Sequence, residues 1–110
     1  MSEVDGEASV AIAADAPYFA GHFPANPVVP GVVVLEHVIE EISRRTGMKR
    51  WPQHIHAVKF LGPLRPGDEL SVELQTTGAN TVRFGCRSGS RPIAVGVITL
   101  HASDFAPRQP

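Results

Sequence analysis

A proline-rich loop that runs directly into an apolar helix constrains this chain more than any other segment. The loop reads Gly21-His22-Phe23-Pro24-Ala25-Asn26-Pro27-Val28-Val29-Pro30, and Gly31-Val32-Val33-Val34-Leu35-Glu36 follows it. Each proline fixes its own φ and biases the residue before it away from helical geometry, so the loop has few conformations available. A rigid loop that ends at a helix N-terminus suits reactive groups, because the first backbone N–H donors there have no intrahelical partner. We therefore expect this run to carry the function.

The spacing of apolar residues predicts one helix after the loop. Leu35, Val38, Ile39 and Ile42 recur at the i, i+3, i+4, i+7 positions of one helical face. The valines between positions 28 and 34 favour a strand by propensity. The helical period nevertheless continues to position 42, so we predict a helix from position 31 that ends at Thr46-Gly47, with the glycine in the left-handed conformation.

Alternation of apolar and polar residues, and a nearly all-apolar run after position 92, predict five strands, one before the loop and four after the helix. Their expected ranges are 7–14, 54–61, 70–75, 82–86 and 93–100. Pro66-Gly67 suits the two central positions of a type II turn. One helix and one antiparallel sheet must bury each other, so the sequence predicts a single α+β domain over residues 1–110 in which the sheet curls around the helix. We expect a loose tail from about residue 104.

Composition and charge exclude several classes of protein. The chain has 110 residues, 43% of them hydrophobic, and its net charge of −1 gives no indication of nucleic-acid binding. A single cysteine, Cys86, excludes an internal disulfide, and we expect it in the core. The acidic N-terminus lacks a signal-peptide pattern, and no apolar stretch is long enough to span a bilayer, so we expect a cytoplasmic protein without a membrane partner. Strand 93–100 and the helix N-terminus are apolar on more surfaces than one small sheet can cover, which predicts a homodimer.

Two recurrent stretches carry a family resemblance. The first comprises Gly21-His22-Phe23-Pro24, Pro27, Pro30-Gly31 and Leu35-Glu36, and the second comprises Lys59-Phe60-Leu61, Pro63 and Arg65-Pro66-Gly67-Asp68-Glu69-Leu70, with Ala94-Val95-Gly96 further on. Over residues 10–100 the chain resembles the hotdog-fold 3-hydroxyacyl-(acyl-carrier-protein) dehydratases of the FabA/FabZ type, in a short FabZ-like form. Family members usually carry an additional N-terminal segment. Shorter chains of this kind look similar to dehydratases of polyketide-like or aryl-polyene pathways.

The resemblance implies a fold, an activity and a site. The fold is the hotdog, an antiparallel sheet wrapped around one central helix. The activity is removal of water from a 3-hydroxyacyl thioester, held by phosphopantetheine on an acyl carrier protein, without metal or organic cofactor. The implied site combines His22 and Glu36 from different subunits of a homodimer or larger oligomer, with the backbone N–H of Gly31 as donor to the thioester carbonyl. The acid at position 36 is a glutamate and not an aspartate, which resembles the branch of the family that dehydrates without isomerising.

The chemistry of these three groups fits the reaction. Dehydration needs a base for the Cα proton, an acid for the departing hydroxyl and a donor for the developing enolate oxygen. His22 can be the base because its ordinary pKa lies near neutrality. Glu36 follows Val33, Val34 and Leu35, and apolar surroundings would raise its pKa and keep it protonated as the acid. Gly31 at a helix N-terminus suits an oxyanion.

Several residues admit more than one interpretation. Phe23, Pro30 and Phe60 are candidates for an acyl tunnel, although a strand phenylalanine such as Phe60 is more often plain core. His54 and His56 share a strand face and could bind a metal, but without a third ligand we interpret them as surface histidines. The basic residues near the helix C-terminus offset the helix dipole, or alternatively dock an acidic carrier protein; they are Arg44, Arg45, Lys49 and Arg50.

Two other functions remain open for this fold. A hotdog thioesterase would release a free thiol, and a non-catalytic module would bind an acyl chain without reaction. The presence of both His22 and Glu36 favours the dehydratase over either alternative.

Overall fold

The computed structural model describes residues 4–15 and 28–105, and its elements follow the predicted order of one strand, one helix and four strands. Their bounds are β1 Gly6–Ala11, α1 Gly31–Thr46, β2 His54–Phe60, β3 Glu69–Thr76, β4 Thr81–Ser88, β5 Arg91–Thr99 and α2 Ala102–Phe105. The last helix corrects only the start of the expected loose tail, because Asp104 lies in α2 and pairs with the guanidinium of Arg50 at 2.9 Å, whereas residues 106–110 lie outside the described part of the chain. Neither helix is long and apolar enough to cross a membrane within the described residues.

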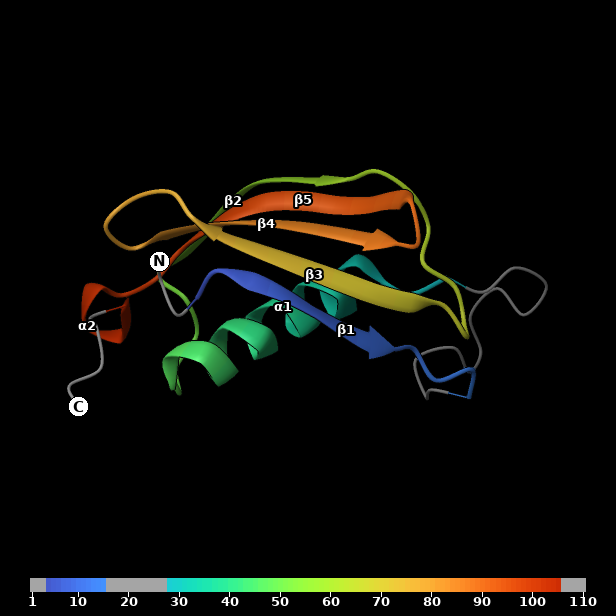
Figure 1. Ribbon diagram of the computed structural model, residues 1–110, viewed down its shortest axis with the longest axis horizontal. Coiled ribbons are helices and arrows are strands. Elements are labelled where there is room, and N and C mark those ends of the chain that lie inside the picture. Colours follow the sequence, from blue (N-terminus) through green and yellow to red (C-terminus); the bar gives the residue numbers. More distant parts are fainter. Residues whose placement is uncertain (1–3, 16–27, 106–110) are drawn as a thin grey trace.

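The five strands form one antiparallel sheet in the order β1-β3-β4-β5-β2. Figure 1 shows α1 lying lengthwise along one face of this sheet, which is the α+β arrangement that the hotdog resemblance implies. The edges of the sheet are β1 and β2, each hydrogen-bonded to one neighbour only. A single helix thus covers a single face. The other face carries polar side chains of β3 and β4, such as Glu73 and Arg83, together with Val95 and Val97 of β5.

Helix α1 begins and ends as its sequence predicts. Gly47 adopts a left-handed φ of 79° and donates its N–H to the Ser43 carbonyl, which stops the helix. The helix buries one stripe against the sheet, and the core between the two layers contains nearly all of the large aliphatic residues. Its most deeply buried side chains are Phe84, Ile42, Leu64, Leu70, Leu74, Ile93, Ile98, Leu100, Val38 and Val82. Cys86 is also buried there, as expected.

The first strand is shorter than the predicted range of 7–14 for a physical reason. Ile12 donates its N–H to the Asp68 carbonyl and accepts a bond from the Gly67 N–H, both at 2.9 Å. These bonds are to a turn and not to a strand, so β1 ends at Ala11 although Ile12 is buried. The turn itself has the expected type II features, with Gly67 at φ 85° and the Asp68 N–H bonded to the Arg65 carbonyl.

A β-bulge in β2 is the main feature that the sequence pattern does not predict. His56 pairs with Val97 and Lys59 pairs with Val95, so two residues of β2 oppose one residue of β5. Ala57 in the bulge has a φ of 54°, an uncommon conformation for a residue with a Cβ. Because of the extra residue, the alternation of side chains along β2 is reversed after the bulge. Positions that would otherwise face one side of the sheet therefore face the other.

Candidate active site

The N-terminus of α1 presents unpaired backbone donors. Pro30 occupies the N-cap position with φ −58° and ψ 144°, and no side chain caps the helix. The Pro30 carbonyl accepts the N–H of Val33 at 3.0 Å, whereas the N–H groups of Gly31 and Val32 have no acceptor among the described residues. The partial positive charge of the helix dipole is concentrated at these groups, so this position suits a developing oxyanion. Gly31 therefore lies at the helix N-terminus, as the sequence predicts, while its role as a donor stays a prediction.

Phe60 lies directly against Gly31. A Cβ added to Gly31 would sit 2.7 Å from the ring Cζ of Phe60, so only a glycine leaves room for the ring in this position. The bulge in β2 explains the contact, because it turns Phe60 to the face of the sheet that carries α1, opposite buried Ala94 of β5. The ring is still 53% exposed. Phe60 is thus partly open to solvent beside the helix N-terminus, which favours the tunnel interpretation over plain core.

Glu36 departs from the expected surroundings. It lies on α1 but is exposed, because it falls on the stripe that Val32 and Glu40 share at intervals of four residues. Val32 on the same stripe is 59% exposed. The predicted apolar burial of Glu36 is therefore wrong for the single chain: its sequence neighbours Val33, Val34 and Leu35 point around the helix and do not enclose it.

His22 and Phe23 fall in residues 16–27, outside the described part of the chain. Their proposed roles as base and tunnel wall stay predictions. Pro30, the third tunnel candidate, is described and is exposed at the start of α1. Gly31, Glu36, Pro30 and Phe60 are thus gathered near one end of one helix, and a separation of five residues places Glu36 about 7.5 Å along the helix axis from Gly31.

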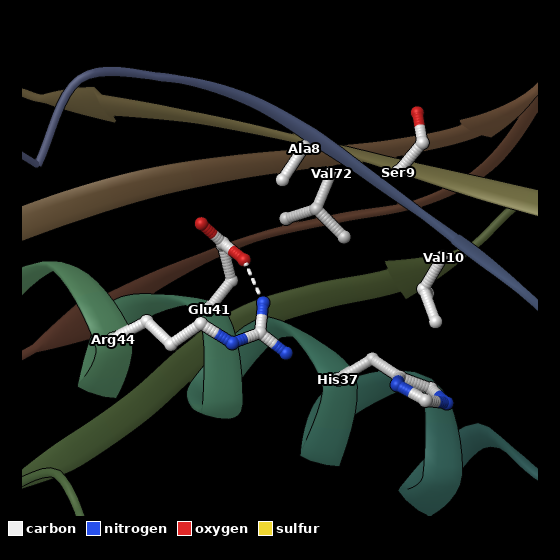
Figure 2. A pocket seen from close by; sticks show the side chains of 7 residues that line it. All are labelled: Ala8, Ser9, Val10, His37, Glu41, Arg44 and Val72. Carbon is white, nitrogen blue, oxygen red and sulfur yellow. Dashed lines mark hydrogen bonds and ion pairs between the residues drawn. The ribbon is translucent and has the colours of Figure 1, made fainter.

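A small pocket on the opposite flank of α1 is not this site. Figure 2 shows its lining, which comes from β1, β3 and α1: Ala8, Ser9, Val10, His37, Glu41, Arg44 and Val72. Its volume of about 20 Å³ holds about one water molecule, far too little for an acyl thioester. The buried carboxylate of Glu41 lies in it and is held by Arg44 and by Arg45, the latter at 2.7 Å. This pocket is therefore a small gap beside the ion pairs on this side of α1.

Three of the four residues of the basic cluster at the helix C-terminus, all except Lys49, make contacts within the described chain. Arg44 pairs with Glu40 at 2.8 Å and also with Glu41, and Arg45 additionally donates to the carbonyls of Asp5 and Glu7. Arg50 pairs with Asp104. Some of these partners lie in α1 itself, and the others come from the N-terminal segment and from α2, so sequence spacing could not reveal them all. The contacts argue against a carrier-docking role for this cluster.

The remaining titratable candidates behave as structural or surface residues. His54 and His56 are exposed on β2 with ring centroids 4.9 Å apart. Within residues 4–15 and 28–105 no group of three or more potential ligands could hold a metal ion. Burial raises the pKa of the Cys86 thiol to about 12, so this cysteine is a poor nucleophile.

Comparison with known proteins identifies the family. The model of the ApeI-like family, described as ApeI dehydratase, matches residues 2–97. The 3-hydroxyacyl-[acyl-carrier-protein] dehydratase FabZ of Bartonella henselae is 35% identical over 114 residues, which cover 91% of this chain and 74% of that protein. The chain spans about half the length of several other FabZ relatives, from 44% to 57%.

Solved structures support the same fold. A chain of the dehydratase heterocomplex ApeI:P from Xenorhabdus doucetiae superposes with a TM-score of 0.74 at 24% identity, covering 86% of this chain and 84% of that one. The fluoroacetyl-CoA thioesterase FlK superposes with a TM-score of 0.58 at 14% identity, covering 92% and 90%. At these identities the likeness concerns the fold alone, which dehydratases and thioesterases share. The family model and the FabZ relative show the family: this chain belongs to the ApeI-like dehydratase family of hotdog proteins.

Proposed function

We propose that this protein removes water from 3-hydroxyacyl thioesters on an acyl carrier protein and produces trans-2-enoyl thioesters. The observation that supports this most directly is the helix N-terminus, where the N–H of Gly31 is unpaired and Glu36 follows on the same helix after an axial rise of about 7.5 Å. A donor for an enolate oxygen and a carboxylic acid are therefore presented together. The pathway is fatty-acid or polyketide-type synthesis, including aryl-polyene synthesis.

The three groups divide the reaction between them. His22 takes the Cα proton while the N–H of Gly31 stabilises the charge that develops on the thioester oxygen. The electron pair forms the Cα–Cβ double bond as the Cβ–O bond breaks. Glu36 supplies a proton to the departing hydroxyl, which leaves as water. No step in this scheme requires a metal ion or an organic cofactor.

The exposed position of Glu36 supports a site completed by a second copy. Four large apolar side chains of α1, of β2 and the residue after it, and of β5 are exposed: Val32 is 59% exposed, Phe60 53%, Leu61 50% and Val95 37%. The adjacent strand β2 is an edge strand with one side free of pairing to the described chain. A second copy seated on this edge would cover the apolar side chains and surround Glu36 with apolar groups. The proposed active form is therefore a homodimer with two shared sites.

A direct assay tests the activity. Purified protein is incubated with a 3-hydroxyacyl pantetheine thioester, and enoyl formation is followed by ultraviolet absorbance and mass spectrometry. His22→Ala and Glu36→Gln should each lower kcat by about 10²–10⁴-fold, the usual contribution of a general acid or base. Glu73→Gln, an equivalent change at an exposed position of β3, is the matched control. Normal turnover by either of the first two variants would overturn the mechanism.

The same assay separates the alternatives. Release of a free thiol without an enoyl product would indicate a thioesterase, and tight thioester binding without any product would indicate a non-catalytic module. Sedimentation analysis tests the homodimer, because Leu61→Glu should shift the protein towards monomer and reduce activity together. A fully active monomer would contradict the shared site.

A further inference from the structure

The face of the sheet that points away from α1 has a central rung of unusual composition. Figure 1 shows α1 on the other face. Strand register places four residues side by side across this outer face, one each from β2, β5, β4 and β3, and they are Lys59, Val95, Gly85 and Glu73. The rung thus runs from a cation through a valine and a glycine to an anion. We call these four residues the outer rung.

Nothing in the described chain requires the glycine of this rung. A Cβ added to Gly85 meets no atom within 4 Å, whereas a Cβ at Gly31 or Gly96 would meet a phenylalanine ring. The φ of Gly85 also lies outside the left-handed region that favours glycine. A glycine in the interior of a strand weakens the strand, and it often marks a site that another molecule approaches closely. Gly85 therefore leaves a hollow in the outer face.

An exposed valine lies beside this hollow. Val95 is 37% exposed although β5 is an interior strand with neighbours on both sides. A copy seated on the β2 edge would approach Val95 from the side only, because β5 and β4 lie one and two strands in from that edge. The hollow at Gly85 therefore stays open to a partner that approaches the face itself.

The charged ends of the outer rung have no ion-pair partner of their own. Lys59 and Glu73 are both exposed, and neither makes an ion pair among residues 4–15 and 28–105. Glu7, which lies opposite Glu73 on β1, is bound by Arg87 instead. An unpaired exposed charge keeps its attraction for an opposite charge outside the chain, so the outer rung has one cationic end and one anionic end available.

A two-fold axis makes the outer rung complementary to itself. When the axis runs parallel to the strands and passes between β5 and β4, a second copy faces the first with its strand order reversed. Val95 then lies over Gly85 of the second copy, and by symmetry the contact forms twice. Lys59 and Glu73 lie about 7 Å from the axis on opposite sides, so each faces the other across the gap of about 10 Å between packed sheets.

We propose that the outer face binds a second copy of this chain face to face. Val95 occupies the hollow at Gly85 of the second copy, and the charged ends of the outer rung pair across the interface. Five strands at the usual spacing and rise offer about 550 Å² per copy, and a total of about 1,100 Å² is at the low end of specific interfaces. We therefore expect a weak association that depends on protein concentration. The contact involves neither Gly31 nor Glu36, so it is independent of the proposed function.

A charge swap tests the pairing. Lys59→Glu should raise the protein concentration needed for association at least about tenfold at low ionic strength, because it places like charges opposite each other. Glu73→Lys should do the same. The double variant Lys59→Glu/Glu73→Lys should return association to near the wild-type concentration. The two residues are three strand spacings apart in one chain, about 14 Å, so the recovery cannot come from a contact within the chain.

Two single variants complete the design. Lys49→Glu makes the same change of charge at an exposed residue after α1, and it should associate as the wild type does. Gly85→Leu should fill the hollow and weaken association without unfolding the chain, since the position is open within its own chain. Sedimentation equilibrium over a dilution series measures each association, and circular dichroism with thermal melting verifies that each variant is folded.

The outcomes decide the proposal directly. Unchanged association in Lys59→Glu, or a double variant no better than the single ones, would overturn it and leave the outer face to solvent or to a different protein. An equal loss in Lys49→Glu would also overturn it, because net charge alone would then explain the result. Recovery in the double variant together with weaker association in Gly85→Leu would support the face-to-face contact.

Discussion

Gly96→Ala should destabilise the protein because an aromatic ring already occupies the space that the added Cβ would need. A Cβ at position 96 would lie 2.6 Å from both Cε2 and Cζ of Phe84, which is 0.8 Å less than the 3.4 Å where ordinary contact begins. Val58 Cγ2, at 3.1 Å, closes the other side. Phe84 is 1% exposed and packed between sheet and helix, so its ring has no free space to enter.

The expected loss of stability follows from the free-energy cost of an overpacked core. Inserting a methyl group into a filled core typically costs 1–3 kcal/mol, and we expect about 2 kcal/mol for Gly96→Ala. For a domain of this size that corresponds to a decrease in Tm of roughly 8 °C. Chemical denaturation followed by circular dichroism gives the free energy of unfolding directly.

Two further variants isolate the cause. At Gly85 in β4 an added Cβ has nothing within 4 Å, so Gly85→Ala should be neutral or stabilise by about 0.4–1 kcal/mol. The double variant Gly96→Ala/Phe84→Leu should recover part of the loss, and a double-mutant cycle with Phe84→Leu measures this coupling. A Gly96→Ala variant as stable as the wild type, or an equal loss in Gly85→Ala, would refute the steric reasoning.

Two further predictions concern titratable groups. Burial raises the pKa of the Cys86 thiol to about 12, so it should not react with a thiol reagent at pH 8 until the protein is unfolded, and rapid reaction of the folded protein would contradict this placement. Hydrogen bonds from the Thr76 hydroxyl and N–H, each 2.7 Å, lower the pKa of Asp5 from its usual 3.8. Because the pKa is lower in the folded state, this stabilisation is present above pH 3.8 and is lost as the pH falls through the lower folded value. Asp5→Asn should therefore show a smaller decrease in Tm between pH 5 and pH 2 than the wild type; an identical decrease would contradict the contribution of Asp5.

Local sequence determined the elements whose signals lie within a few residues of one another. The apolar period from Leu35 to Ile42 specified α1, and Gly47 ended it in the left-handed conformation. Pro66-Gly67 specified the turn before β3. These features depend on backbone sterics and on the spacing of side chains along one element, and both can be read from the chain itself. The order of strands and helix followed from the same signals.

Tertiary structure decided the features that depend on distant partners. No local signal marks Ala57 as the site of a bulge, yet the pairing of β2 with β5 places it there and turns Phe60 onto Gly31. Arg45 is engaged because β1 lies beside the helix, and Asp68 is bound by Arg91 because β5 begins beside the turn. The apolar sequence around Glu36 could not predict its exposure, since burial depends on which face of the helix the sheet covers. Contacts between residues far apart in sequence are set by packing, and that is why the sequence could nominate candidate groups for the chemistry but could not predict the surroundings of each group.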